Sequence, residues 1–191
     1  TAAEAILNPK RHDCDYPFDA LAGVGVAFKL ILALAIKNGL KTTDVFNQYV
    51  DIATLGTIAD VVPLLGENRV IVDKGLKILH NPKRIGIRAI MEVAGVLDKP
   101  LSASTIAFSI APRLNAAGRL GSAATAVELL LTNDESRARE LALLLDTENK
   151  ERQQTERQIF DEALELIAKD PNFEKKKVIV LAQENWHQGV I

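Results

Sequence analysis

The feature that most constrains the fold is a stretch without glycine or proline that runs from Thr132 to Asp170. It opens on the sequence Thr-Asn-Asp-Glu, which matches a helix-capping box with Thr132 as the N-cap. A single helix of about 35 residues would be on the order of 50 Å long. Both ends of the stretch are amphipathic, but residues 146–158 contain no apolar side chain. This pattern is typical of a helix that bridges two domains through solvent, and a break into two helices is the alternative.

Composition excludes several classes of protein. Of the 191 residues, 48% are hydrophobic, which excludes a wholly disordered chain. The formal net charge of −2 argues against a polybasic surface, so any anion site must be a local cluster. The single cysteine, Cys14, rules out an internal disulfide and suits the reducing cytoplasm. Residues 21–36 are the most apolar stretch, but it is short and carries Lys29, so we expect a core helix and no membrane span.

The chain divides into three parts. Residues 1–131 are predicted to be mostly helical, residues 132–170 form the long helix, and residues 171–191 begin a second domain with a buried strand from Lys177 to Ala182. Glycine, proline and serine punctuate the first part. They predict a loop at 111–121 and helices at about 19–38, from 43 onward, and at 67–80, 86–95, 102–110 and 123–131.

Asp60 is the charged residue of an apolar run, Thr57 to Leu65. A carboxylate buried in such a run is costly unless a cation or several hydrogen bonds compensate it. One interpretation is that Asp60 ties down the loop before Pro63. The other is a ligand for a divalent metal, because Mg²⁺ and Mn²⁺ prefer carboxylate oxygens. One carboxylate does not hold a metal pair, so the other ligands would have to lie outside this chain.

Arg113, Asn115 and Arg119 are separated by small residues in the predicted loop. Small side chains let a ligand approach the backbone, and guanidinium groups bind phosphate with paired donors. Two surface arginines in a turn between helices are the alternative. His187 follows the predicted strand and precedes Gly189, a position where α/β proteins commonly contact ligands, although a lone histidine is more often structural.

Several strings resemble, in order, the RecJ family of single-strand-specific DNA exonucleases within the DHH phosphoesterase superfamily. They are Asn8–Arg11 with Tyr16–Phe18, Leu21–Leu30, Gly56–Leu64, Pro112–Arg119 and Trp186–Val190. The resemblance implies an α/β protein of which this chain supplies a mostly helical part. Residues 1–131 would be the later half of the DHH domain, 132–170 the connector helix, and 171–191 the start of the DHHA1 domain.

The resemblance also implies a function: hydrolysis of single-stranded DNA in the 5′ to 3′ direction, in DNA repair and recombination, with two Mn²⁺ or Mg²⁺ ions. Asp60 matches a metal-ligating aspartate of the family. Arg113, Asn115 and Arg119 match a motif that faces the substrate phosphates, and His187 matches the DHHA1 motif that closes the cleft. Single-stranded DNA is the implied partner, with single-strand-binding protein and repair helicases as further partners.

The chain departs from the family pattern, because the Asp-rich and Asp-His-His motifs are absent from it. We therefore expect this chain alone to be inactive. Two alternatives stay open. The first is a DHH phosphodiesterase that acts on oligonucleotides or cyclic dinucleotides, which the sequence after Ile191 would reveal. The second is a non-catalytic replisome scaffold of the same superfamily, which the sequence before Thr1 would reveal.

Overall fold

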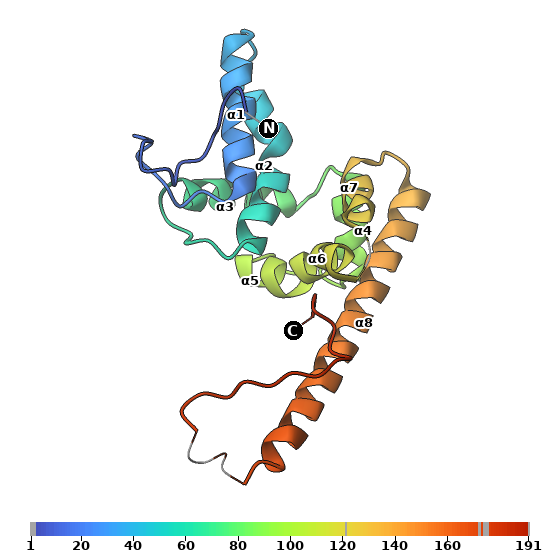
Figure 1. The fold of residues 1–191 in the computed structure, drawn as a ribbon. Helices are drawn as coiled ribbons and strands as arrows, with labels where there is room; N and C mark the ends of the chain where they lie inside the picture. Colours follow the sequence, from blue (N-terminus) through green and yellow to red (C-terminus); the bar gives the residue numbers. More distant parts are fainter. Residues whose placement is uncertain (1–2, 121, 172, 174–175, 191) are drawn as a thin grey trace.

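The computed structural model describes residues 3–120, 122–171, 173 and 176–190, and its regular elements are helices (Figure 1). The prediction of a mostly helical chain is therefore confirmed. In chain order the helices are α1 (Gly23–Lys37), α2 (Thr42–Ala59), α3 (Gly66–Leu79), α4 (Ile85–Val93), α5 (Ala103–Thr105), the π-helix η1 (Ile106–Ile110), α6 (Ala111–Leu120), α7 (Ala123–Leu131) and α8 (Glu135–Ala168).

Two hydrophobic clusters hold the helices together. The smaller one joins α1, α2 and α3 around Leu21, Phe28, Val50, Ala53 and Ile71. The larger one joins α4, η1, α6, α7 and the first half of α8, and the last turns of α2 reach it through Leu55 and Ile58. α3 reaches the larger cluster as well, through Val72 and Leu79. Because α2 and α3 contribute to both clusters, they fix the position of α1 relative to the rest of the described chain.

Glycines allow two of these helix contacts to be very close. A Cβ atom added at Gly75 of α3 would lie 1.8 Å from the Thr54 hydroxyl of α2. One added at Gly86 of α4 would lie 1.7 Å from the backbone carbonyl oxygen of Leu129 in α7. Side chains at these positions would force the helices apart.

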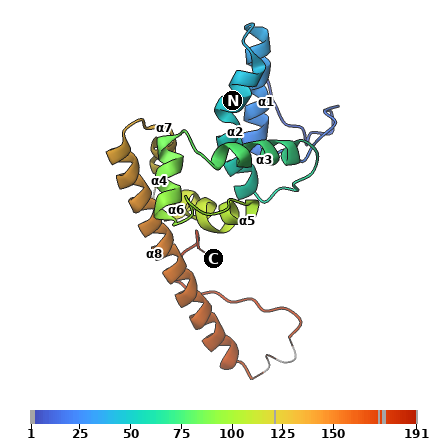
Figure 2. The same ribbon diagram turned by 180° about the vertical axis from the view of Figure 1, so that it is seen from behind.

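The long helix predicted from Thr132 onward is confirmed as α8, an unbroken helix of 34 residues. It runs past α4, α6 and α7 and then continues well beyond them (Figures 1 and 2). Its N-cap is Asp134, whose side chain accepts the Arg137 N–H at 3.0 Å, so the prediction of Thr132 as the cap was wrong by two residues.

The polar middle of α8 is not solvated along its whole length, which corrects the sequence prediction. Asp146 is only 6% exposed and Asn149 is also buried. Both lie where α6 packs against α8, and Arg113 of α6 provides Asp146 with a cationic partner. Beyond this contact α8 leaves the helical body. No described residue of α8 after Asn149 is buried, so the predicted bridge through solvent can apply only to the second half of the helix.

The loop predicted at 111–121 is a helix in the structure, since α6 covers residues 111–120 and continues directly from η1. Pro112 has no N–H to donate along the helix, and its ring needs space next to the preceding turn. The wider π turn of residues 106–110 supplies that space, so the proline lies inside a continuous helical rod. The prediction failed because it took Pro112 and Gly118 as turn residues.

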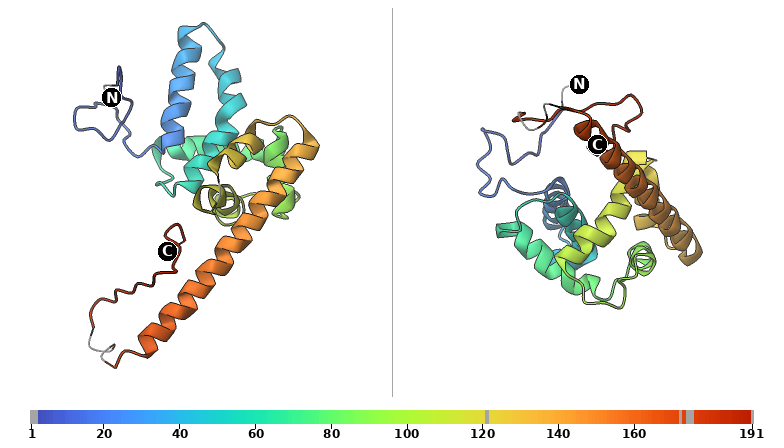
Figure 3. Two further views of the ribbon diagram at one scale, coloured as in Figure 1. Left: turned by 45° about the vertical axis from the view of Figure 1, so that its right-hand side comes forward. Right: turned by 90° about the horizontal axis from the view of Figure 1, so that it is seen from below.

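The strand predicted at 177–182 is not formed within the described residues. The chain returns from the far end of α8 towards α6 as an extended segment (Figure 3). Val178 and Val180 are exposed, because no neighbouring strand in the described chain offers them a hydrogen-bonded ladder. The division into two partial domains, 1–131 and 171–191, joined by a connector helix stays a prediction. In the part of the chain that the structure describes, no helix has both the length and the hydrophobicity needed to cross a membrane.

Candidate functional site

Asp60 is the C-terminal cap of α2, and it is exposed. Its backbone N–H donates to the Gly56 carbonyl at 3.0 Å, which closes the last turn of the helix. The carboxylate thus lies at the negative end of the helix dipole, where a negative charge is unfavourable. The expectation of a buried carboxylate was wrong, and the local structure gives Asp60 no evident stabilising role.

The residues after Asp60 explain why it is exposed. Val61, Leu64 and Leu65 belong to the apolar run, but they lie on the surface because no described helix packs over them. Val61 is 85% exposed and has a φ of 57°, in the left-handed region. A β-branched residue is strained there, by about 1–2 kcal/mol. Strain of this kind clusters at functional sites.

The side chains present do not form a metal centre by themselves. Among the described residues, no group of three or more histidine, cysteine, aspartate or glutamate side chains is close enough to hold a metal ion. A hard divalent cation takes about six oxygen ligands, and Asp60 supplies one carboxylate. A metal held by Asp60 would need its other ligands from outside this chain.

Arg113 lies in the contact between α6 and α8. Its Nε donates to the Asp146 Oδ1 atom at 2.8 Å, and its Nη1 donates to the Ser109 carbonyl one turn earlier in the rod. Lys150 contacts the other Asp146 oxygen at 2.7 Å. Burial raises the pKa of Asp146, but Lys150 and Arg113 outweigh it and hold that pKa below its ordinary value. The structure thus gives Arg113 a structural partner where we expected a phosphate contact.

Asn115 and Arg119 occupy another face of α6. They are four residues apart, so their side chains lie on the same face of the helix. Both are exposed. Arg119 donates from Nη1 to the Gly189 carbonyl at 2.8 Å, across 70 residues of sequence. This contact brings the C-terminal turn onto the end of α6.

His187 is held within that turn. The Gly189 N–H donates to the His187 Nδ1 atom at 3.1 Å, and the Val190 N–H donates to the His187 carbonyl at 2.9 Å. A nitrogen that accepts a hydrogen bond carries no proton, so the neutral ring bears its proton on Nε2. The backbone of Gly189 therefore contacts both predicted phosphate-binding residues, His187 through its N–H and Arg119 through its carbonyl.

The structure thus brings together two of the predicted residues, Arg119 and His187, with Asn115 on the same face of α6. Arg113 lies apart, against α8. No hydrogen bond or ion pair of the described residues joins Asp60 to any of them, although the end of α2 packs on η1 and α6. His187 and Arg119 are both exposed, and the Nε2–H of His187 and the N–H groups of Arg119 that Gly189 leaves unused suit an anionic ligand such as phosphate.

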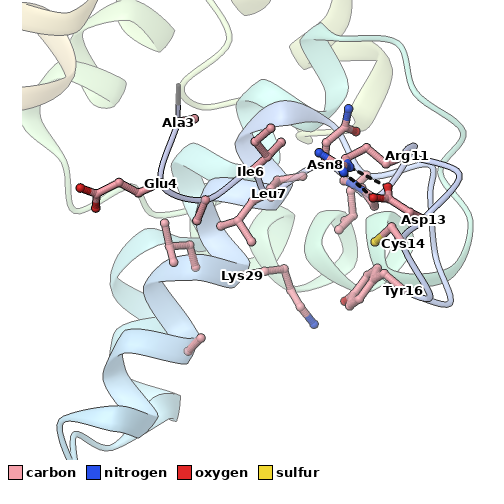
Figure 4. Close-up of a pocket in the computed structure, with 16 residues that line it drawn as sticks. Ala3, Glu4, Ile6, Leu7, Asn8, Arg11, Asp13, Cys14, Tyr16 and Lys29 are labelled. Atoms are coloured by element: carbon pink, nitrogen blue, oxygen red, sulfur yellow. Dashed lines mark hydrogen bonds and ion pairs between the residues drawn. The ribbon is translucent and has the colours of Figure 1, made fainter. Parts of the chain in front are cut away.

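A separate hollow of about 700 Å³ lies between the N-terminal loop and α1 (Figure 4). Ile6 and Leu7 line it, and none of the predicted site residues does. Lys29 at its margin donates to Glu67 at 2.7 Å, and Tyr16 donates to the other Glu67 oxygen at 2.7 Å. Arg11, the other cation of the lining, pairs with Asp13. Both cations are already paired, so this hollow does not add to the candidate anion site.

Sequence reasoning missed two residues that support the site. Asp146 belongs to the polar stretch that we expected to be solvated, and Glu162 is one of many charged residues on α8. Glu162 accepts a hydrogen bond from the Trp186 indole at 2.8 Å. No sequence signal marks either residue, because both contacts depend on how distant segments pack.

The fold and the site together define a class of protein. It has a helical unit, α1 to α7, and one long helix, α8, that projects from this unit. The segment after α8 returns to the helical unit and contacts α6. The chain matches no protein family model. It is homologous over nearly its whole length to RecJ, the single-stranded-DNA-specific exonuclease. Identity is 43% over 198 residues with the Haemophilus influenzae protein, 41% over 187 with that of Bacillus subtilis and 40% over 206 with that of Escherichia coli.

These matches cover 99%, 98% and 100% of this chain, but 34%, 23% and 35% of the respective relatives. The chain therefore spans about a quarter to a third of their length. The comparison with solved structures agrees with the comparison of sequences. RecJ from Thermus thermophilus, crystallised with Mn²⁺, superposes with a TM-score of 0.79 at 39% identity over 92% of this chain and 25% of that one. Solved RecJ structures include complexes with Mn²⁺ and with Mg²⁺.

Proposed function

We propose that this chain is part of a RecJ-type exonuclease, a hydrolase that degrades single-stranded DNA from its 5′ end in the presence of Mn²⁺ or Mg²⁺. The observation that carries the proposal is about 40% identity across nearly the whole chain to proteins named for that activity, together with the structural match to metal-bound RecJ. Action in the cytoplasm, in DNA repair and recombination, with single-strand-binding protein and helicases as partners, belongs to the same proposal.

Each candidate residue has a role in this proposal. Asp60 supplies one carboxylate to a metal centre whose other ligands come from sequence outside this chain. Arg119 and His187 donate to phosphate oxygens of the strand, and Asn115 lies beside them on α6. Arg113 holds α6 against α8 through Asp146, and so supports the arginine and the histidine indirectly.

The 191-residue chain alone should bind a single strand weakly and should not cut it, because Asp60 provides too few metal ligands. The test is fluorescence anisotropy with a labelled oligothymidylate at several salt concentrations, followed by incubation with Mn²⁺. Arg119→Ala should lower the affinity and reduce the salt slope by about one, because one phosphate contact is lost.

The matched control is Arg88→Ala, which removes the same charge from an exposed position on α4. It should leave the salt slope unchanged. Equal slopes for Arg119→Ala and the unmodified chain would refute the phosphate role of Arg119. Metal-dependent degradation by the 191-residue chain would refute the claim that its metal ligands are incomplete.

A further inference from the structure

The C-terminal turn meets α8 at Glu162, which accepts hydrogen bonds from the side chains of Trp186 and Asn185. The indole Nε1–H of Trp186 donates to the Glu162 Oε2 atom at 2.8 Å. The other oxygen of Glu162 accepts from the Gln158 side chain, one helical turn earlier, at 2.9 Å. Both carboxylate oxygens are therefore engaged, and the direction in which Glu162 receives the indole is fixed.

A second contact attaches the same turn to α6, where Arg119 donates to the Gly189 carbonyl at 2.8 Å. The segment before the turn adds little, since Val178 and Val180 are exposed. Among the described residues, polar contacts thus hold the turn to Glu162 of α8 and to Arg119 of α6. His187 lies between them in sequence and takes its orientation from Gly189.

We propose that Glu162 is a positioning residue: by accepting the Trp186 indole, it holds the turn on α8 and keeps His187 next to Arg119. This inference rests on the proposed function for the phosphate role of those two side chains. The hydrogen bond is charge-assisted, which makes it stronger and more directional than one to a neutral acceptor. Without the Glu162 carboxylate, the turn would lose the contacts of both Trp186 and Asn185 to α8 and would depend on the Arg119–Gly189 contact.

Fluorescence tests the proposal directly, because the chain contains one tryptophan and its emission reports this position alone. Glu162→Leu removes the acceptor and keeps a good helix former in α8. Its emission should shift to longer wavelength and its quenching by acrylamide should increase. Glu162→Gln keeps an acceptor oxygen, and the Gln158 amide can turn over to pair with it, so this variant should resemble the unmodified chain.

The matched control is Glu165→Leu. Glu165 lies on the same helix, is exposed and contacts Lys169 at 3.3 Å. It should change neither the emission nor the quenching, and circular dichroism should show equal helix content in all variants. Unchanged emission of Glu162→Leu would overturn the proposal, and so would a shift of the same size in Glu165→Leu.

A second readout concerns His187, one of three histidines in the chain. The nitrogen chemical shifts of its ring should report the Nε2–H tautomer in the unmodified chain. In Glu162→Leu they should report a mixture of the Nε2–H and Nδ1–H tautomers. Affinity for oligothymidylate should fall by about three- to tenfold in Glu162→Leu and recover in Glu162→Gln. A Glu162→Leu chain that binds the strand as tightly as the unmodified one would overturn the positioning role.

The two proposals fail in different ways. If the unmodified chain does not bind a single strand, the proposed function of this segment is refuted, and the fluorescence and the ring-nitrogen shifts still decide whether Glu162 positions the turn. If the strand binds but Glu162→Leu alters neither readout, the positioning role is refuted and the proposed function stands.

Discussion

Arg113 offers the sharpest test of the structure, because sequence and structure give it different roles. In the structure its guanidinium pairs with Asp146, which is 6% exposed, and 18% of the Arg113 side chain is accessible. Arg113→Met removes the charge but keeps an unbranched apolar stem in the α6–α8 contact. The variant therefore isolates the ion pair from the packing of the side chain.

The magnitude follows from what remains around Asp146. Removing one partner of a buried ion pair costs about 3–5 kcal/mol when the other charge is left uncompensated. Here Lys150 still contacts the second oxygen at 2.7 Å, but its side chain is 72% exposed, so it compensates only in part. We expect a loss of about 2–3 kcal/mol, which for a chain of this size lowers the melting temperature by roughly 4–12 °C.

The assay is urea unfolding followed by far-ultraviolet circular dichroism, on Arg113→Met, Asp146→Asn and the double variant. The cycle should give a coupling free energy of about 1–3 kcal/mol between the two residues. A stability of Arg113→Met within about 0.5 kcal/mol of the unmodified chain, combined with weakened binding of a single strand, would refute the structural role. It would return Arg113 to the phosphate-binding role that the sequence suggested.

Two further predictions concern stability. Val61→Gly should raise the unfolding free energy by about 0.5–1 kcal/mol, because glycine adopts the left-handed conformation without strain and the Val61 side chain is exposed. A lower urea midpoint would contradict this. The second prediction concerns pH, because the pKa of Asp146 is lowered in the folded chain. The ionised carboxylate therefore adds fully to the free energy of unfolding above the ordinary carboxyl pKa. This stabilisation is lost as the pH falls through the lowered pKa of the folded state. In acid, the free energy of unfolding of Asp146→Asn should therefore vary less with pH than that of the unmodified chain. Parallel plots of unfolding free energy against pH for the two chains would contradict the lowered pKa of Asp146.

The helices that could be predicted are those whose signals are local. α8 follows from a long stretch without glycine or proline and from its amphipathic ends. The end of α1 follows from Gly39 and that of α4 from Gly95, which both adopt a φ of 67° just after the helix. These signals act over a few residues and do not depend on tertiary packing, so the sequence alone reveals them.

The rod formed by α5, η1 and α6 could not be predicted in the same way. Pro112 breaks a regular helix, and whether a π turn absorbs it depends on the packing of neighbouring residues. Ile106 and Ile110, at the two ends of the π turn, are fully buried in the larger cluster. The burial of Ile106 and Ile110 stabilises a helix that continues through Pro112. This burial depends on residues of α4 and α8 in the same cluster, so the local sequence does not predict it.

The same distinction between local signals and tertiary packing applies to the candidate site. The sequence selects Arg119 and His187 by residue type, but their meeting on Gly189 spans 70 residues and depends on the length and direction of α8. The supporting residues Asp146 and Glu162 have no distinguishing local pattern. Motifs therefore identify the candidate side chains, whereas the side chains that hold them in place emerge from the packing.

Asp60 shows how an unfavourable local structure can point to function. Two features at this position lower stability: a carboxylate at the negative end of a helix and a valine in the left-handed region directly after it. A neutral residue followed by glycine would remove both. Neither feature is compensated by a contact of Asp60 among the described residues. A sequence chosen for the stability of these helices alone would not keep this arrangement, and the proposed role of Asp60 as a metal ligand would account for it.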